Sequence, residues 1–537
     1  MEQFSGKAVF PGIVFGKALL FTKPDLQVDS SPSSNPDAEW QAFQQAVREA
    51  DTQLGILFEK TRTELGEEKA MIVGIQRMML EDGDFLEAVE RMIQRDAARA
   101  AHAVDQAGKQ FYELFASMDD AYMRARAPDI ADVFRRLTAI LLAAETDFSL
   151  TEPAILIAED LSPGDILTLD RKLIRAFVTC GGSLNSHTAI LARILNIPLI
   201  VQTNIPLDRR LDGQYAVVDG YNGVIYLEPD AETEALLEEE QRKHDAERAA
   251  LESLRGISAV TRDGRRIELA ANISGIADLD AVLDNGAESI GLFRSEFLFL
   301  GRQDYPGEDE QFEVYRAAAV VMKGRRVVVR TLDIGADKQA PYFGLKKEEN
   351  PALGLRAVRV CFLQPKVFKT QLRAIYRASA WGNIAILFPM IASIRELRKC
   401  REFAAEARAE LVEQGLTPGE VEMGIMIETP AAALCAEELA READFFSVGT
   451  NDLTQYTLAM DRQNPRLEPF MDTHHPAILR LLAMTAEGAA RAGIRVGICG
   501  ELAADPEMTR QFIDMGYEEL SVAPSLIPEM RKRIREL

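Results

Sequence analysis

Residues 181–193 read GGSLNSHTAILAR, and an apolar run, LIRAFV at residues 173–178, precedes them. The run is typical of a buried strand, and the paired glycines predict a turn. After the turn, Ile190 with Ile194 repeats at helical spacing. Pro198 ends that helix, and LIV at 199–201 begins another strand. The stretch therefore predicts a strand, turn, helix and strand within an α/β domain.

One histidine stands where this turn enters the helix. His187 has Asn185 or Ser186 beside it as a candidate N-cap. Free N–H groups and the positive dipole end of such a helix bind anions, and they disfavour imidazolium. A neutral imidazole at an anion-binding helix start suits the acceptance of a phosphoryl group. Taken alone, a turn histidine of this kind more often has only a structural role, so its interpretation depends on the rest of the chain.

Length and composition limit the class of protein. With 537 residues, several domains are expected, and 47% hydrophobic with 27% charged residues is typical of a globular protein. The net charge of −23 argues against nucleic acid or an anionic membrane as a partner. No signal pattern or membrane-spanning apolar run is visible, and the cysteines are scattered. These features predict a cytoplasmic protein with reduced thiols and without membrane insertion.

The pattern of elements predicts a multidomain α/β protein. Residues 1–30 and 148–230 read as one α/β domain that carries His187. Residues 31–147 are poor in glycine and proline and have apolar residues at spacings of three and four, which predicts an inserted all-helical subdomain. Residues 231–256 read as a charged linker helix, and residues 257–537 repeat strand then helix eight times. Eight such units predict a C-terminal (β/α)8 TIM-type barrel.

The eight candidate strands are apolar runs, as expected for strands buried on both faces. They are Ile267–Ile273, Ser289–Leu292, Arg326–Thr331, Ile384–Met390, Glu422–Ile427, Asp444–Val448, Arg495–Ile498 and Glu519–Val522. Barrel active sites lie at the C-terminal ends of the strands, so the residues that follow each strand are the candidates for chemistry.

Polar residues follow several of these strands. Arg294, Arg330, Arg356 and Arg462 offer planar forks that suit phosphate and carboxylate oxygens. Glu428 and Asp452 are hard oxygen ligands, too few for a closed cage but suited to Mg²⁺ completed by substrate and water. Asn451 is a candidate donor to phosphate. Cys499 is either a proton donor or a buried small hydrophobe. Together they predict a site for a small anion with phosphate and carboxylate groups, bound through magnesium.

Five motifs carry a resemblance to a known family. They are GLFRSEFLF (291–299), EENP (348–351), IETPAA (427–432), GTNDLTQYT (449–457) and CGELA (499–503). These segments closely resemble enzyme I of the bacterial phosphoenolpyruvate:sugar phosphotransferase system, and the resemblance extends over essentially the whole chain.

The resemblance implies a function for each candidate. A swivelling domain presents His187, which takes the phosphoryl group of phosphoenolpyruvate, and Cys499 protonates C3 of the enolate to give pyruvate. The implied magnesium ligands are Glu428 and Asp452, and the implied substrate-binding residues are Arg294, Arg330, Arg356, Asn451 and Arg462. The family further implies transfer to the histidine-containing phosphocarrier protein, docked on the helical subdomain, to drive sugar uptake. It also implies a homodimer formed through the barrel.

The loop before His187 departs from the family. The family usually reads GGRTSH, whereas residues 182–187 read GSLNSH, so Leu184 stands in the place of an arginine. Ile166 stands where the family has a threonine that orients the histidine ring, and Asn185, Ser183 and Thr168 are the candidates to replace it. These differences bear on the rate of transfer and on the choice of partner.

Three alternatives accompany this interpretation. A pyruvate phosphate dikinase or phosphoenolpyruvate synthase needs an ATP-binding domain, for which no part of the chain remains. A catalytically weak docking protein is expected to lose His187, Cys499 or a magnesium ligand, and all are present. A paralogue that feeds a dedicated regulatory phosphorelay stays open. His474 and His475 are expected to be surface residues.

Overall fold

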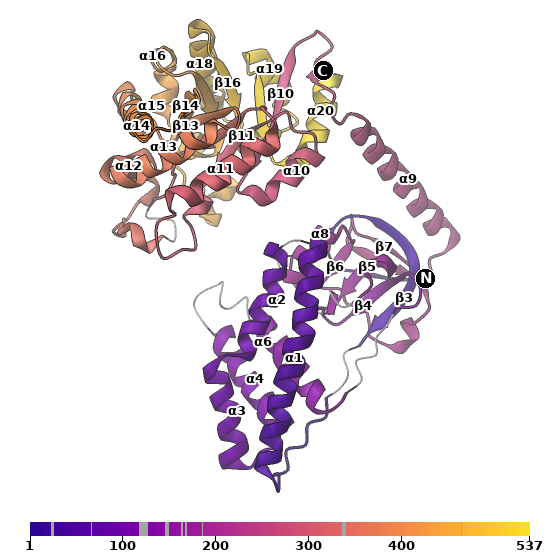
Figure 1. The fold of residues 1–537 in the computed structure, drawn as a ribbon. Coiled ribbons are helices and arrows are strands. Elements are labelled where there is room, and N and C mark those ends of the chain that lie inside the picture. The colour runs from indigo at the N-terminus through magenta and orange to yellow at the C-terminus, as the bar shows by residue number, and fades with distance from the viewer. Residues whose placement is uncertain are drawn as a thin grey trace. The chain divides into compact units, whose positions relative to one another are not determined.

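The computed structural model describes residues 1–22, 26–65, 67–117, 127–144, 150–162, 165–166, 169–184, 186–335, 340–462 and 464–537. The chain separates into two compact units, Met1–Ala246 and Glu247–Leu537, and the division falls inside helix α9 (Ala231–Ser253). Figure 1 shows α9 as one continuous helix, and its sequence is rich in charged residues. The first unit contains an α/β sheet and a helical block, and the second contains a barrel.

The first unit is built on one eight-stranded sheet of order β1-β8-β7-β3-β4-β5-β6-β2. Its strands are β1 (Glu2–Ser5), β2 (Lys7–Phe10), β3 (Ile13–Phe21), β4 (Ala154–Ala158), β5 (Ile174–Thr179), β6 (Leu199–Val201), β7 (Tyr215–Asp219) and β8 (Val224–Leu227). β3 runs parallel to β4, with Leu19 beside Leu156, although more than a hundred residues separate them. The helices between β3 and β4 are therefore an insertion into the α/β fold, as the sequence predicts.

The inserted helices form a block with its own aromatic core. They are α1 (Pro36–Leu65), α2 (Glu67–Leu80), α3 (Gly83–Asp96), α4 (Ala100–Ala116) and α6 (Ala127–Leu141). Phe85 of α3 lies fully buried at the centre, 4.7 Å from the ring of Phe134 and 5.9 Å from that of Phe43. Leu191 of α8 (His187–Leu195) joins this core, whereas Ala189 of the same helix packs on the sheet. Helix α8 is thus held between the sheet and the helical block.

The second unit contains a closed barrel of eight parallel strands. They are β10 (Arg266–Ile273), β11 (Ser289–Arg294), β12 (Val327–Arg330), β13 (Ile384–Phe388), β14 (Glu422–Ile427), β15 (Phe445–Val448), β16 (Arg495–Ile498) and β17 (Glu519–Val522). Neighbours pair in chain order, and β17 pairs with β10 to close the barrel. The short strand β9 (Ala259–Val260) extends β10 in antiparallel fashion. The predicted TIM-type barrel is confirmed, and each predicted strand matches an observed one to within two residues at either end.

Helices cover the outside of the barrel in Figure 1. They are α10 (Leu279–Asp284), α11 (Glu308–Met322), α12 (Val358–Leu363), α13 (Pro365–Ser379), α14 (Ile394–Glu413), α15 (Pro430–Leu434), α16 (Ala436–Ala440), α17 (Thr450–Leu458), α18 (Pro476–Ala492), α19 (Thr509–Met515) and α20 (Ile527–Glu536). Short 3₁₀ turns include Ser295–Leu298, Pro351–Leu353 and Glu501–Ala504, each directly beyond a strand end or within its loop. These turns place polar side chains at one end of the barrel.

The opposite, N-terminal end of the barrel is filled by side chains. Phe445 packs so closely on Gly424 that a β-carbon at Gly424 would lie 2.4 Å from the ring. The guanidinium of Arg326 lies 4.0 Å from the centre of the same ring, and it pairs with Glu422 at 2.8 Å. A cation over an aromatic face is attracted by the ring quadrupole. Side chains therefore close the N-terminal end of the barrel, and a ligand would enter from the C-terminal end.

None of the described helices contains an apolar stretch long enough to cross a bilayer.

Candidate functional site

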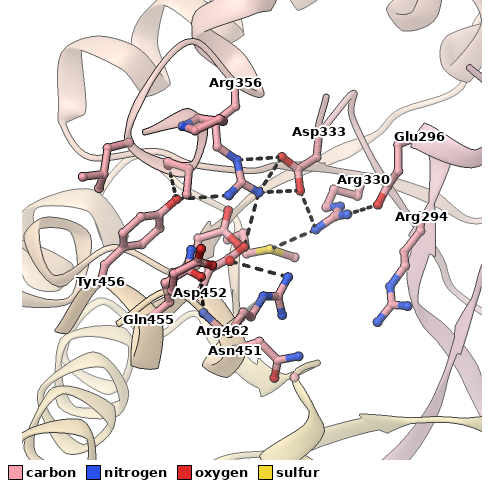
Figure 2. A pocket seen from close by; sticks show the side chains of 18 of the residues that line it. Arg294, Glu296, Arg330, Asp333, Arg356, Asn451, Asp452, Gln455, Tyr456 and Arg462 are labelled. Carbon is pink, nitrogen blue, oxygen red and sulfur yellow. Dashed lines mark hydrogen bonds and ion pairs between the residues drawn. The ribbon is translucent and has the colours of Figure 1, made fainter. Parts of the chain in front are cut away.

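A cavity of about 840 Å³ opens at the C-terminal end of the barrel. Its walls come from the ends of β11, β12, β14, β15 and β16 and from the loops that follow them. Figure 2 shows arginine and carboxylate side chains converging on it. The structure brings together in this cavity all eight barrel residues that the sequence nominates: Arg294, Arg330, Arg356, Glu428, Asn451, Asp452, Arg462 and Cys499.

One carboxylate organises two of the arginines. Asp333, which follows β12, pairs with Arg356 at 2.9 Å and with Arg330 at 3.3 Å (Figure 2). Arg330 also pairs with Glu296, and Arg356 lies 3.4 Å from Asp452. All five side chains are buried. Because each guanidinium is fixed from two sides, its remaining N–H groups are oriented before any ligand arrives.

The charges of this cluster support one another. Burial alone would lower the pKa of the Arg330 guanidinium, but Glu296 and Asp333 outweigh it and hold that pKa above its ordinary value. The pKa of Arg356 is raised in the same way, with Asp333 and Asp452 outweighing burial. Both arginines are therefore permanently cationic, as a site for a small polyanion requires.

Glu428 is held by an unusual backbone turn. Its carboxylate is buried at the end of β14 and accepts a hydrogen bond of 2.6 Å from the N–H of Met390. Met390 has φ of +57°, in the left-handed region that non-glycine residues seldom adopt. Burial raises the pKa of Glu428 to about 8, and the negative charges of Asp452 and Asp333 add to that rise. The carboxylate is thus in a position that favours a bound cation.

Asp452 supplies the second hard oxygen donor. It lies in the first turn of α17, with Oδ2 directed to Arg356 and Oδ1 at 3.7 Å from Arg462. Oδ1 is buried and, among the described residues, has no hydrogen-bond donor. Buried carboxylate oxygens normally have a hydrogen-bond donor, so one without a donor indicates a binding position for a ligand or ion. Within the described residues no group of three or more His, Cys, Asp or Glu side chains is placed to hold a metal. Two carboxylates fit Mg²⁺, which keeps water or substrate oxygens in its remaining positions.

Cys499 lies at the end of β16 with its thiol among the interior side chains of the barrel. The thiol donates to the carbonyl of Val448 at 3.5 Å. Burial raises the pKa of Cys499 to about 11, against the lowering effect of Ser447 and of the Arg330 charge. The group therefore carries its proton at neutral pH, which is the form that a proton donor needs.

The remaining candidates lie at the rim. Asn451 exchanges two hydrogen bonds with Glu501, at 2.9 Å through its amide and 3.0 Å from the Glu501 N–H. Arg462 is exposed, and its backbone N–H donates to Gln455. Arg294 also lines the cavity, and none of the ion pairs found among the described residues involves it. Arg294 and Arg462 are therefore the cations most available to a ligand.

Some residues of the cluster were given no role from the sequence. Glu296 follows β11 and Asp333 follows β12, and in these two segments the sequence predicts roles only for Arg294 and Arg330. Tyr456 donates to the carbonyl of Ala352 at 2.5 Å and accepts from Arg356 at 3.0 Å, so it ties the loop after β12 to the site. An acidic residue three positions after a strand-end arginine is the signal that could have identified Asp333.

Disrupting this cluster is expected to destabilise the protein. Arg356→Met leaves Asp333 and Asp452 buried with less positive charge, so the free energy of unfolding should fall by about 3 kcal/mol. Urea denaturation monitored by circular dichroism measures the change. Arg462→Met is the matched control, because its exposed guanidinium lies 3.7 Å from Asp452 and should contribute less than about 1 kcal/mol. Equal losses in the two variants would contradict this account of the cluster.

The other candidate residue, His187, begins α8 in the first unit. Ser186 is the N-cap, as one of the two sequence alternatives proposes: its hydroxyl accepts from the Ala189 N–H at 3.2 Å and donates to the Ser183 carbonyl at 3.0 Å. The His187 side chain and Asn185 lie outside what the structure describes. The helix start that would favour an anion and a neutral imidazole is therefore present in the backbone.

The unusual loop positions are partly visible. Leu184 is 40% exposed, and its carbonyl accepts from Arg193 at 3.0 Å. Ile166 is buried in the sheet core, whereas Thr168 lies outside the described residues. The hydroxyl of Thr188, next to His187, donates to the carbonyl of Leu161. This bond fixes the first turn of α8 against the loop that follows β4.

The paired histidines of the barrel loop have local partners. The His474 ring lies 2.8 Å from an oxygen of Asp505, and the His475 ring accepts from the Ala477 N–H as the N-cap of α18. Neither of them lines the cavity.

Comparison with known proteins gives the family. Family models match residues 248–537 (PEP-utilising enzyme, PEP-binding domain), 5–126 (PEP-utilising enzyme, N-terminal) and 150–223 (PEP-utilising enzyme, mobile domain). A phosphoenolpyruvate-protein phosphotransferase of Bacillus subtilis is 40% identical over all of this chain and 95% of its own length. One from Staphylococcus carnosus is 40% identical over all of this chain and 94% of its own.

Among solved structures, an NMR structure of an Enzyme I protein (nEIt) is 31% identical with a TM-score of 0.40, and the match covers 45% of this chain and 99% of that one. The resemblance read from the five motifs is confirmed by the full-length relatives. The chain belongs to the phosphoenolpyruvate-protein phosphotransferase family of PEP-utilising enzymes.

Proposed function

We propose that this chain is an enzyme that takes the phosphoryl group of phosphoenolpyruvate onto His187, releases pyruvate, and passes the phosphoryl group to a histidine-containing phosphocarrier protein in sugar uptake. The observation that carries the proposal is the cavity in which four arginines, two candidate magnesium ligands and a protonated thiol converge. Such a cavity matches a substrate with one phosphate, one carboxylate and a carbon to be protonated. The full-length relatives support the same reaction.

In this mechanism the arginines bind and orient the substrate. Arg330 and Arg356, fixed by Asp333, with Arg294, Arg462 and Asn451 at the rim, would hold the phosphate and carboxylate oxygens. Mg²⁺, held by Glu428 and Asp452, would supply positive charge to the oxygens of the bound substrate. The arginines stabilise the negative charge that develops on the leaving enolate.

The reaction then divides into two bond changes. A ring nitrogen of His187 attacks phosphorus, the bond from phosphorus to the enolate oxygen breaks, and its electron pair stays with the enolate. The Cys499 thiol gives its proton to C3 of that enolate to form pyruvate, and the thiolate regains a proton from solvent. Since His187 and the cavity belong to different units, the transfer requires that His187 reach the substrate bound in the cavity of the second unit.

The test is incubation of the full-length chain with phosphoenolpyruvate labelled in its phosphate, with and without magnesium. We expect acid-labile label on the protein, one pyruvate released for each phosphoryl group bound, and loss of both on chelation of the metal. Addition of a purified histidine-containing phosphocarrier protein should move the label to that protein. A folded chain that takes up no label with magnesium present would refute the enzyme and favour a docking protein.

Cys499→Ala is expected to lower the rate of pyruvate formation by about 100-fold or more, because general acid catalysis contributes factors of that order. Without the thiol the enolate is protonated only by solvent, and the phosphoryl transfer can reverse. A lactate dehydrogenase-coupled assay measures pyruvate directly. Cys400→Ala is the control, since Cys400 is a buried cysteine of α14 that does not line the cavity. Wild-type rates in Cys499→Ala would remove this thiol from the mechanism.

The docking surface and the oligomeric state are further parts of the proposal. The helical block exposes Ile56 on α1 and Met78 on α2, each 68% exposed, and these helices pack side by side. Single exposed apolar side chains are common on soluble proteins, so these two residues do not by themselves define a docking surface. We assign the phosphocarrier to the helical block and a homodimer contact to the barrel on the basis of the family resemblance. Sedimentation equilibrium of the full chain and of its mixture with the phosphocarrier tests both.

A further inference from the structure

A fully buried glutamine connects an outer helix of the barrel to the strand ends. Gln371 lies on α13, and its amide has three partners. Its Oε1 accepts from the N–H of Leu332 at 2.9 Å. Its Nε2 donates to the hydroxyl of Ser295 at 2.8 Å and to that of Tyr315 at 3.2 Å. Every polar atom of this side chain is therefore engaged within the protein.

The chemistry of the partners fixes the orientation of the amide. The N–H of Leu332 can only donate, so it must face the oxygen of Gln371, and the NH₂ group must then face the two hydroxyls. Each hydroxyl accepts from Gln371 and keeps its own proton to donate onward. Ser295 donates to the carbonyl of Arg330 at 2.6 Å, and Tyr315 donates to Gln311 at 3.4 Å. The amide thus sets the direction of a buried chain of hydrogen bonds.

This series of hydrogen bonds ends at two segments of the candidate site. Ser295 stands between Arg294 and Glu296, which line the cavity after β11. Leu332 stands between Arg330 and Asp333, which line it after β12. One amide therefore clamps the two strand ends whose side chains, Glu296 and Asp333, hold the Arg330 guanidinium.

We propose that Gln371, through Ser295, is a positioning residue that sets the place of Arg330 for binding of the phosphoenolpyruvate substrate, an inference that rests on the proposed function. Gln371, Ser295 and Tyr315 do not line the cavity, so they act through other residues. Buried polar groups that are fully satisfied specify one arrangement of the chain around them. A shift of about 1 Å in such a binding group is enough to weaken substrate binding.

The test compares Gln371→Met, Gln371→Glu and Ser295→Ala in the full-length protein by steady-state pyruvate release. We expect each variant to raise KM for phosphoenolpyruvate about tenfold, with kcat within about threefold of wild type. Glu296 and Asp333 still keep the Arg330 charge within the site, so kcat changes little. The displaced guanidinium binds the substrate less well, so KM rises. Gln371→Glu keeps the size of the side chain and its acceptor toward Leu332. It draws the Ser295 proton away from the Arg330 carbonyl, so it should be as harmful as Gln371→Met.

The double variant Gln371→Met with Ser295→Ala separates positioning from a merely structural effect. Because both residues act on Arg330 through one hydrogen-bond chain, the double variant should raise KM no more than either single variant. Gln364→Met is the matched control: Gln364 is the half-buried N-cap residue of the same helix, and its amide bonds Tyr305 and Phe343. It should leave KM unchanged.

The possible results are distinct. A wild-type chain that does not turn over phosphoenolpyruvate would overturn the proposed function and this inference with it. Active wild type together with folded variants of unchanged KM would overturn the inference alone, as would multiplied effects in the double variant. If the Gln371 variants do not fold, Ser295→Ala, which removes one hydroxyl, carries the test with the same expected tenfold rise in KM.

Discussion

His187→Ala is expected to abolish acid-labile labelling of the chain by phosphoenolpyruvate, a loss of at least about 1,000-fold. The alanine has no lone pair to attack phosphorus, and no water can give a protein-bound product. The start of α8 should remain intact, since Ser186 caps it through its own hydroxyl and the backbone of Ala189. Quenched-flow labelling followed by acid treatment measures the phosphohistidine directly.

The barrel should keep its affinity for substrate in this variant. Calorimetric titration of His187→Ala with phosphoenolpyruvate and magnesium should give binding without turnover, because the cavity residues all lie in the second unit. His474→Ala is the matched control and should label like wild type, as its ring contacts Asp505 and does not line the cavity. Label that persists in His187→Ala would place the phosphoryl group on another residue.

The barrel was predictable because its strands carry a strong local signal. Each buried strand of a parallel barrel must be apolar on both faces, so the eight runs stand out between amphipathic helices. β14 and β16 begin and end where the sequence predicts, and β12 is one residue shorter at each end. The extra residues, Arg326 and Thr331, are polar and lie at the two ends of the barrel, where side chains turn from the sheet to ionic or loop contacts.

The convergence of the site was also predictable, since parallel strands bring their C-terminal ends together. What the sequence could not give is the pairing within the cluster. Asp333 bonds Arg356 across 23 residues and Arg330 across three, and nothing local tells which arginine a carboxylate will meet. Gln371 is a stronger case, because it stands in the middle of an amphipathic helix, where an amide normally faces solvent. Its hydrogen-bond partners are distant in the sequence and come together with it only in the folded barrel.

Around His187, local sequence preferences predict where the helix starts but not its contacts with distant parts of the chain. Ser186 follows from the N-cap preference for small hydroxyl residues. The role of Thr188 does not, because its hydroxyl reaches a carbonyl 27 residues earlier in the chain. The resemblance was nevertheless sufficient to give the family, since the most specific motifs lie in the loops that form the cavity.

Asp452→Asn is expected to lower kcat/KM for phosphoenolpyruvate by about 1,000-fold at saturating magnesium, equivalent to about 4 kcal/mol of transition-state stabilisation. The amide keeps the size of the side chain but loses one negative charge. In wild type, Oδ1 is a buried oxygen that has no hydrogen-bond donor among the described residues, and in the variant an amide group replaces this carboxylate. The magnesium concentration for half-maximal activity should rise in parallel, which a metal titration of pyruvate release measures.

The control for this variant must remove a carboxylate from the same cavity without removing a magnesium ligand. Asp461→Asn meets that condition, because Asp461 is exposed at the rim. Its effect should stay within about threefold, because Asp461 is exposed and salt screens the interactions of exposed charges. The Mn²⁺ ion takes the same carboxylate, carbonyl and water ligands as Mg²⁺. Because Mg²⁺ gives up its bound water reluctantly, Mn²⁺ should restore part of the activity of Asp452→Asn. If both variants lost activity equally and neither changed the metal requirement, Asp452 would act only through its charge on Arg356 and the cation would have to be held elsewhere.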